Sequence, residues 1–304
     1  MIIRRRSRNS SAARIGSLGK PRSILVTGAS GFIGRHLVRE LDSRGHDVRA
    51  HSSADGDIAG CALDYEGVDH VFHLAGLSFV PDSWNRARDY YRVNLLGTIN
   101  VLEFCRRSGA SLTMISTYVY GQPEHLPIDE EHPVRAFNPY SHTKILAEEA
   151  TRYYAQQFGI RAAIIRSFNS YGFGQSPQFL IPKLLAQALD RSRHEIIVAD
   201  TRPRRDYLYI SDLVEMLILS MERRASGTYN AGSGRSASIA EILSVLWSLG
   251  LEPKPLRSEN KPRTEEVLDV IADIGKAKRE LGWMPCVGLR DGLAAMLECM
   301  RGKS

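Results

Sequence analysis

Apolar runs alternate with amphipathic segments through the first half of the chain. Runs of the strand type occur at residues 23–27, 46–50, 69–74, 112–116 and 161–166. Helical patterns separate several of them, at residues 35–41, 94–107 and 140–158. This alternation predicts a parallel sheet covered by helices on both faces. Only about twenty residues separate the second strand from the third, so we expect a shortened crossover there.

A glycine-rich turn follows the first predicted strand and precedes the first predicted helix. Gly28, Gly31 and Gly34 have the spacing Gly-x-x-Gly-x-x-Gly. Gly28 permits a tight turn, Gly31 lets the backbone approach a pyrophosphate, and Gly34 lets helix and strand pack closely. Free N–H groups at the start of the helix favour a phosphate. The turn therefore predicts a dinucleotide-binding unit.

The pattern changes after residue 172. Clusters of Gly, Pro and Arg interrupt shorter helical patterns at 182–191, 212–223, 238–249 and 276–281. We therefore expect a Rossmann-type doubly wound α/β fold with a smaller α/β substrate-binding domain. The expected divisions are a basic, disordered tail over 1–22, a dinucleotide-binding domain over 23–172 and a second domain over 173–304, with part of 205–232 returning to the first.

Composition narrows the possible partners. The formal net charge is +6, but residues 1–22 contribute seven basic residues and no acid, so the rest of the chain carries −1. We therefore expect no nucleic-acid partner. No apolar run approaches the length of a membrane span, and none follows the tail as in a secretory signal. The cysteines are scattered without metal-ligand spacing, which favours a reduced, cytoplasmic compartment and no metal site.

Three polar side chains suggest the chemistry. Tyr140 and Lys144 lie four residues apart at the start of a long predicted helix, so both point to one face. Ser116 ends a predicted strand of the same sheet, where a ligand-facing hydroxyl is expected. A phenol is a poor base at neutral pH, but a nearby ammonium and an oxidised nicotinamide ring favour the phenolate. We expect Ser116 to hold a substrate oxygen while Tyr140 exchanges its proton.

These motifs, in their order, resemble the extended short-chain dehydrogenase/reductase family, in the branch that remodels nucleotide-diphosphate sugars. The matching segments are residues 27–34, 73–76, 94–98, 116–121, 138–144, 166–172, 205–207 and 281–283. The resemblance implies that Ser116, Tyr140 and Lys144 are the catalytic residues. It also implies that Asn94 helps to position Lys144 through its backbone.

The resemblance further implies two sets of binding residues. Those for the coenzyme are Gly28, Ser30, Gly31, Phe32, Ile33, Gly34, Ser52, Asp57, Ile58, Leu74, Ala75, Gly76, Asn94, Tyr140 and Lys144. Those for the nucleotide-diphosphate sugar are Ser78, Ser116, Tyr118, Asn169, Arg205 and Arg263. The two arginines would clamp the diphosphate, because a guanidinium makes paired charge-assisted bonds to phosphate oxygens.

The residues at the end of the second predicted strand do not decide between NAD and NADP. NAD-specific relatives carry an acid there for the ribose 2′-hydroxyl, whereas this chain has His51, Ser52 and Ser53. Without a carboxylate, nothing repels a 2′-phosphate. No arginine stands in the adjacent positions, however, and Arg49 comes slightly earlier. We expect NAD or NADP, with NAD slightly favoured.

The reaction has two main candidates. Thr117 and Tyr118 stand where sugar 4,6-dehydratases carry an Asp-Glu pair, and neither can perform that acid-base chemistry, so we exclude this reaction. The resemblance implies an epimerase that acts at sugar C4 through a 4-keto intermediate and transient hydride transfer. The alternative is an NADPH-dependent 4-ketoreductase of a nucleotide-linked 4-keto-6-deoxy sugar. Residues 172–177 resemble a segment of GDP-4-keto-6-deoxymannose reductases, although Phe173 replaces a proline. A third candidate, an idle binding protein, is disfavoured because Ser116, Tyr140 and Lys144 are all present.

Two further expectations come from the resemblance. Val270 falls where some 4-epimerases place a gate beside the sugar's C2 group, and its small side chain predicts tolerance of N-acetylated sugars. The helices at 94–107 and 140–158 match those through which family members form homodimers.

Overall fold

A parallel sheet forms the centre of the computed structural model, which describes residues 22–261 and 266–301. The strand order is β2-β1-β3-β4-β5-β9, and every pairing is parallel. The strands are β1 (Ser23–Thr27), β2 (Asp47–His51), β3 (His70–His73), β4 (Ser111–Thr117), β5 (Ala162–Ser167) and β9 (Gly227–Ala231). The expected strands are confirmed, and β9 is an edge strand that the sequence pattern did not indicate. Apart from Arg22, the predicted tail lies outside the described residues.

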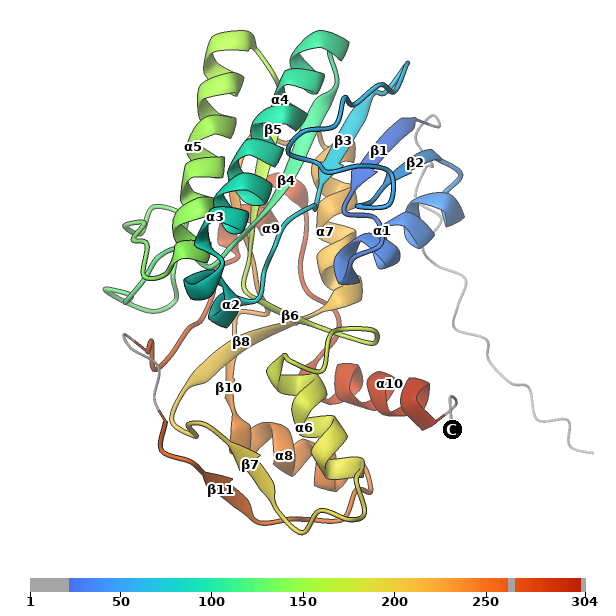
Figure 1. Ribbon diagram of the computed structural model, residues 1–304. Helices are drawn as coiled ribbons and strands as arrows, with labels where there is room; N and C mark the ends of the chain where they lie inside the picture. Colours follow the sequence, from blue (N-terminus) through green and yellow to red (C-terminus); the bar gives the residue numbers. More distant parts are fainter. Residues whose placement is uncertain (1–21, 262–265, 302–304) are drawn as a thin grey trace, which may run out of the picture.

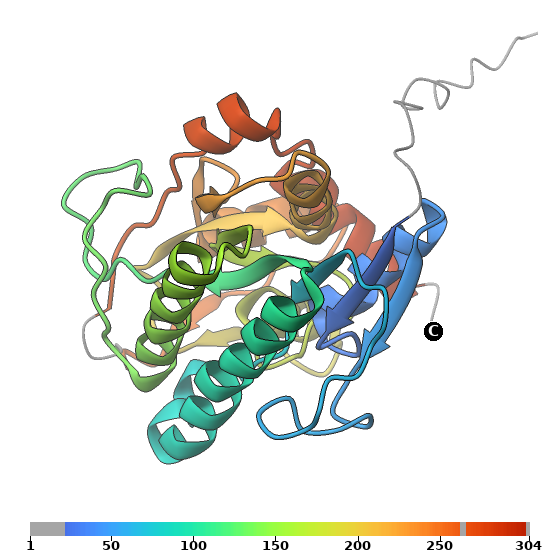
Figure 2. The same cartoon turned by 90° about the horizontal axis from the view of Figure 1, so that it is seen from above.

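Helices cover both faces of this sheet, as expected for a doubly wound fold (Figure 2). One face carries α1 (Phe32–Ser43), α7 (Ile210–Glu222) and α9 (Gly275–Leu281). The other carries α4 (Gly97–Ser108) and α5 (Pro139–Phe158). Before α4 lie the short helices α2 (Val80–Asn85) and α3 (Ala87–Tyr90) and a π-helical turn, η1 (Tyr91–Leu96). The described residues between β2 and β3 contain no helix, so the shortened crossover is confirmed.

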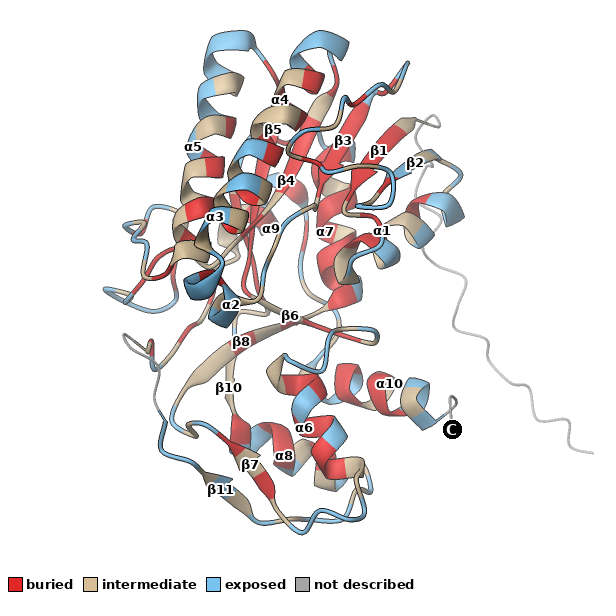
Figure 3. Cartoon of the chain, viewed as in Figure 1, coloured by how far each residue is buried: buried red, intermediate tan, exposed pale blue. Residues whose placement is uncertain are grey.

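A smaller unit lies below the carboxyl ends of the central strands (Figure 1). It contains a three-stranded sheet, β10-β8-β6, and a two-stranded sheet, β11-β7. Their bounds are β6 (Asn169–Tyr171), β7 (Ile196–Val198), β8 (Arg204–Tyr209), β10 (Ser236–Ser238) and β11 (Leu256–Ser258). The helices of this unit are α6 (Leu180–Leu189), α8 (Ile239–Ser248) and α10 (Leu289–Arg301). They bury a separate apolar core against the small sheets (Figure 3).

The start of α5 places the two residues of the Tyr-x-x-x-Lys motif. Asn138 caps the helix by accepting a hydrogen bond from the Ser141 N–H at 2.8 Å, and Ser141 reciprocates, which forms a capping box. Pro139 occupies the first helical position, where its missing N–H costs nothing. Tyr140 and Lys144 therefore lie on the first turns of a rigid 20-residue helix. No helix of the described residues is long and apolar enough to cross a bilayer.

Candidate active site

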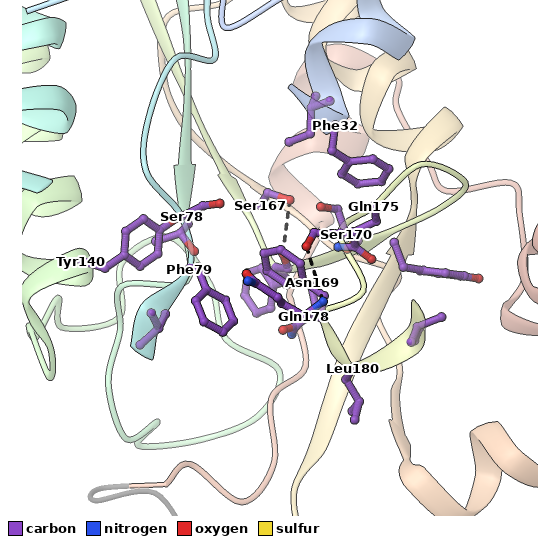
Figure 4. Close-up of a pocket in the computed structure, with 18 of the residues that line it drawn as sticks. Phe32, Ser78, Phe79, Tyr140, Ser167, Asn169, Ser170, Gln175, Gln178 and Leu180 are labelled. Atoms are coloured by element: carbon purple, nitrogen blue, oxygen red, sulfur yellow. Dashed lines mark hydrogen bonds between the residues drawn. The ribbon is translucent and has the colours of Figure 1, made fainter. Parts of the chain in front are cut away.

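A cavity of about 760 Å³ lies between the central sheet and the smaller unit. Its walls come from the segments that follow β1, β3, β4 and β5, where doubly wound folds bind their ligands. In Figure 4, Tyr140, Ser78 and Phe79 lie together on one side, and Phe32 and Gln175 lie on the other. The cavity is therefore shared between the predicted coenzyme turn and the predicted catalytic helix.

The glycine turn has the tight geometry that a dinucleotide requires. Gly28 adopts a φ of 70°, and a Cβ on it would lie 2.6 Å from the Ala75 backbone nitrogen. A Cβ on Gly34 would lie 2.2 Å from the Gly28 carbonyl oxygen, so only glycine lets helix and turn approach this closely. No described side chain caps α1 at Gly31, which leaves the first N–H groups for a phosphate. These residues fit a bound dinucleotide.

Most of the residues expected at the coenzyme do line this cavity. They are Gly28, Gly31, Phe32, Ile33, Gly34, Leu74, Ala75, Gly76, Tyr140 and Lys144. Ser30 is exposed on the turn and is not among the lining residues. Ser52, Asp57 and Ile58 are not lining residues either. Asp57 forms an ion pair with Arg92, and Ile58 is buried against Gly97.

Lys144 and Tyr140 both border the cavity. The Lys144 Nζ donates a hydrogen bond to the Ile115 carbonyl oxygen at 2.7 Å, at the end of β4. Burial lowers the pKa of Lys144 to about 8, although Glu148 acts in the opposite direction. Desolvation raises the pKa of Tyr140 to about 12, and a hydrogen bond with the Thr117 side chain partly offsets this. The protein by itself therefore keeps the phenol neutral, and the predicted phenolate depends on the positive charge of an oxidised nicotinamide ring.

The structure places Thr117, rather than Ser116, beside the phenol. The Ser116 hydroxyl is buried and donates to the Glu148 Oε1 at 2.5 Å. Successive residues of a strand point to opposite faces, so Thr117 points the other way and contacts Tyr140. The Ser116 proton is therefore held by a carboxylate in this structure, and the role of Ser116 at the substrate oxygen stays a prediction.

Glu148 is the residue that sequence reasoning missed. It is fully buried, and its Oε2 accepts from the Arg166 Nη2 at 2.7 Å. Burial alone would raise the pKa of Glu148, but the bonds from Arg166 outweigh it and hold the pKa below its usual value. The sequence signal that could have indicated this network is the position of Glu148 one helical turn after Lys144. An acid at that position lies on the same helix face as Lys144, and a buried acid needs hydrogen-bonding partners.

The Asn94 side chain joins two separate segments by hydrogen bonds. It is buried in η1, a π-helical turn of a kind often found at functional sites. Its Oδ1 accepts from the Leu77 N–H at 2.8 Å, and its Nδ2 donates to the Thr143 hydroxyl at 3.0 Å. The amide thus ties the segment after β3 to the residue preceding Lys144. The expected role of the Asn94 backbone in positioning Lys144 stays a prediction.

Of the six residues expected at the substrate, four line the cavity, one does not, and one lies outside the described residues. Ser78, Asn169 and Arg205 are lining residues. Arg205 pairs with Glu266 and donates to the Val267 carbonyl oxygen at 2.6 Å. Ser116 borders the cavity only with a hydroxyl that is already engaged. Tyr118 does not reach it, because its hydroxyl donates to the Gly121 carbonyl oxygen. Arg263 lies outside the described residues.

Val270 is part of the core and not a gate. It is 2% exposed and packs with Tyr120, Ile128 and Phe168. It is not among the residues that line the cavity. The predicted tolerance of N-acetylated sugars therefore loses its structural basis.

One polar cluster lies outside the cavity. Among the described residues, His125, Asp129 and His132 each offer one potential metal-ligand atom, and these atoms lie within 4.8 Å of one another. The His132 Nδ1 accepts from the Asp129 backbone N–H at 3.3 Å and lies 2.9 Å from the Asp129 Oδ1, and its Nε2 lies 3.2 Å from the His125 carbonyl oxygen, to which it can donate. These hydrogen bonds already satisfy the buried imidazole.

Comparison with known proteins agrees with this geometry. The model of the NAD dependent epimerase/dehydratase family matches residues 24–232. The chain belongs to this family. A UDP-glucose 4-epimerase of Azospirillum brasilense is 30% identical, and the match covers 89% of each chain. The sequence relationship thus extends over nearly the whole chain.

Solved structures extend the likeness to both units. MoeE5 in complex with UDP-glucuronic acid and NAD is 32% identical with a TM-score of 0.83, and the match covers 93% of this chain and all of that one. RMD from Pseudomonas aeruginosa complexed with NADPH is 26% identical with a TM-score of 0.85, and the match covers 93% of this chain and 99% of that one. The protein is an NAD(P)-dependent enzyme of the nucleotide-sugar branch of the extended short-chain dehydrogenases/reductases.

Proposed function

We propose that the enzyme is a nucleotide-diphosphate-sugar epimerase that acts at sugar C4. The supporting observation is that Tyr140 is the acid-base group beside the turn that fits the coenzyme. Among the described residues that line the cavity, the carboxylates are Asp200 and Glu266. Asp200 forms an ion pair with Arg202, and Glu266 forms one with Arg205. Elimination of water from the sugar would need a second acid-base group at the reacting end. The arrangement therefore favours oxidation and reduction of an alcohol carbon.

The side chains then have distinct tasks. Tyr140 exchanges a proton with the sugar C4 hydroxyl, and the Thr117 hydroxyl stabilises the charge that develops on that oxygen. Lys144 anchors the end of β4 through the Ile115 carbonyl oxygen and borders the same cavity as Tyr140. Arg205 provides a guanidinium for the diphosphate. The bound coenzyme supplies the site that accepts and returns the hydride.

One observation favours the 4-ketoreductase as a second candidate. Gly174, Gln175 and Ser176, from the segment that resembles the reductases, line the cavity. The Gln175 side chain donates to the Ser170 carbonyl oxygen at 2.8 Å, which fixes this wall. RMD, one of the similar structures, holds NADPH. The epimerase stands first because the 30%-identical relative from Azospirillum brasilense is named a UDP-glucose 4-epimerase.

The test is turnover without added coenzyme. The purified protein is incubated with UDP-glucose, UDP-galactose and UDP-glucuronic acid, and the products are separated by ion-pair chromatography. We expect the C4 epimer of at least one sugar. Absence of any epimer, together with NADPH oxidation by a GDP-linked 4-keto-6-deoxy sugar, would replace the epimerase by the reductase.

Two tyrosine variants serve as a matched pair. Tyr140→Phe removes the proposed acid-base group and should lower kcat by at least a hundredfold in either reaction. Tyr118→Phe removes a hydroxyl that binds a backbone carbonyl outside the cavity, so its kcat should stay within threefold. Survival of turnover in Tyr140→Phe would exclude the proton-transfer role. A homodimer built on α4 and α5 and a cytoplasmic location stay predictions.

A further inference from the structure

Tyr90, the last residue of α3, is a buried tyrosine to which the proposed reaction gives no task. It is 2% exposed and is not among the residues that line the cavity. Burial raises the pKa of Tyr90, so its hydroxyl keeps its proton at neutral pH and can donate a hydrogen bond. Both parts of this side chain, the ring and the hydroxyl, contact residues that do line the cavity.

The Tyr90 ring packs against the ring of Tyr140. The two ring centroids are 6.3 Å apart and the ring planes make an angle of 80°, which is an edge-to-face arrangement. Aromatic pairs at this separation favour that geometry over a face-to-face sandwich, so the contact restricts the rotation of the Tyr140 side chain. The capping box fixes where α5 begins, and the Tyr90 ring then limits the direction in which the phenol points.

The Tyr90 hydroxyl fixes the wall of the cavity beside the phenol. It donates a hydrogen bond to the Phe79 carbonyl oxygen at 2.6 Å. Phe79 immediately precedes α2 and lines the cavity, and Figure 4 shows it on the same side as Ser78 and Tyr140. The same carbonyl oxygen accepts from the Asp82 N–H of α2 at 3.2 Å. The hydroxyl therefore ties the start of α2 to the end of α3.

The Phe79 ring extends this contact to the smaller unit. It meets the ring of Phe179 with the centroids 6.1 Å apart and the planes at 77°. Phe179 immediately precedes α6 and also lines the cavity. Tyr90 thus connects the phenol on α5 to an aromatic wall to which both units contribute.

We propose that Tyr90 is a positioning residue that holds the Tyr140 phenol and the Phe79 wall in a fixed relation to each other. This inference rests on the acid-base role of Tyr140 in the proposed function, and it applies to the epimerase and the reductase alike. The Tyr90 ring sets the direction of the phenol, and the Tyr90 hydroxyl sets the position of the wall beside it. Misplacement of a reacting group by about 1 Å can lower a rate by roughly a hundredfold. The two contacts use separate parts of one side chain, so each can be removed in turn.

Two substitutions in the full-length protein separate the ring from the hydroxyl. Tyr90→Phe keeps the ring and removes the hydroxyl, so KM for the sugar nucleotide should rise about fivefold, the usual effect of losing one neutral hydrogen bond, while kcat stays within about threefold. Tyr90→Leu removes the aromatic contact as well, and kcat should fall at least tenfold. A kcat that falls in the leucine variant and is retained in the phenylalanine variant assigns the effect on turnover to the ring.

Tyr91→Phe is the matched control. The Tyr91 hydroxyl lies 2.7 Å from the His142 Nδ1 on α5, so its loss removes a hydrogen bond between the same two segments. His142 comes two positions after Tyr140, and residues at that spacing do not face each other on a helix. Both kcat and KM should therefore stay within about twofold of the wild type. Fluorescence titration with NADH checks that the coenzyme site of each variant is folded.

The assignment is overturned if Tyr90→Phe leaves KM within twofold of the wild type, or if Tyr90→Phe and Tyr90→Leu lower kcat equally. It is also overturned if Tyr91→Phe lowers kcat as much as Tyr90→Leu does. An active Tyr140→Phe variant gives a different result, because it would refute the acid-base role in the proposed function on which this inference rests.

Discussion

The Ser116 and Thr117 hydroxyls have different partners, so we predict that removing each one has a different effect. Thr117→Val removes the hydroxyl beside Tyr140 and keeps the shape of the side chain. Ser116→Ala removes the hydroxyl that donates to Glu148 at 2.5 Å. If the geometry is functional, the first change impairs catalysis and the second impairs stability.

The magnitudes follow from the partners of each group. Loss of one preorganised donor to a developing oxyanion lowers kcat by roughly 10²–10³. Loss of one hydrogen bond to a buried carboxylate costs about 2 kcal/mol, because Glu148 keeps its bonds from Arg166. For a protein of this size, that cost lowers Tm by roughly 4–8 °C. Thr117→Val leaves the Glu148 network intact, so its Tm should change by no more than about 2 °C.

The assay combines steady-state kinetics with thermal unfolding of the same preparations. Initial rates of the nucleotide-sugar reaction that the enzyme catalyses, measured over a range of substrate concentrations, give kcat and KM. Thermal unfolding followed by circular dichroism gives Tm. Thr117→Ser should recover most of kcat, because it restores the hydroxyl. Ser116→Ala should retain kcat within threefold at temperatures well below its Tm.

The reverse pattern would refute the reasoning. A hundredfold loss of kcat in Ser116→Ala, with near wild-type turnover in Thr117→Val, would return the hydroxyl role to Ser116. The nucleotide-sugar reaction itself would stand in that case. The acid-base role proposed for Tyr140 would be refuted only if the Tyr140→Phe variant were active.

Other changes test the remaining parts of the site and the core. Gly34→Ala should weaken NADH binding at least tenfold, because its Cβ would lie 2.2 Å from the Gly28 carbonyl oxygen; an unchanged Kd by fluorescence titration would contradict this. Arg205→Ala should raise KM for the sugar nucleotide about tenfold with little effect on kcat, whereas an equal fall in kcat would place Arg205 at the reacting atoms. Burial lowers the pKa of His70 and of His73 to about 3, below about 6.5 in the unfolded chain. The unfolded state then binds more protons below pH 6.5, so stability is complete above that pH and falls towards pH 3, by about 2 kcal/mol for each histidine at pH 5. Urea unfolding at pH 7 and pH 5 measures this loss, and equal stability at both would contradict it.

Features within one element could be predicted from the sequence. The glycine turn is contiguous, so strand, Gly28–Gly34 and helix appear in chain order. The four-residue spacing of Tyr140 and Lys144 fixes their common face, because helical periodicity depends on neighbouring residues. The apolar runs of the central strands are buried on both sheet faces, which makes their pattern strong. The edge strand β9 lacks such a run and was not predicted.

The tertiary structure decided which partner each of two neighbouring hydroxyls has. Ser116 and Thr117 are both hydroxyl residues at a strand end, and only Glu148 on α5 shows which of them is engaged away from Tyr140. A motif match could not show that Tyr118 and Val270 lie outside the cavity, because the apolar cluster in which both pack is built from distant segments. The sequence by itself determined that a dinucleotide enzyme with a Tyr-Lys pair is encoded. The packing of distant segments decided which hydroxyl faces the phenol, because side-chain direction depends on contacts that sequence spacing does not specify.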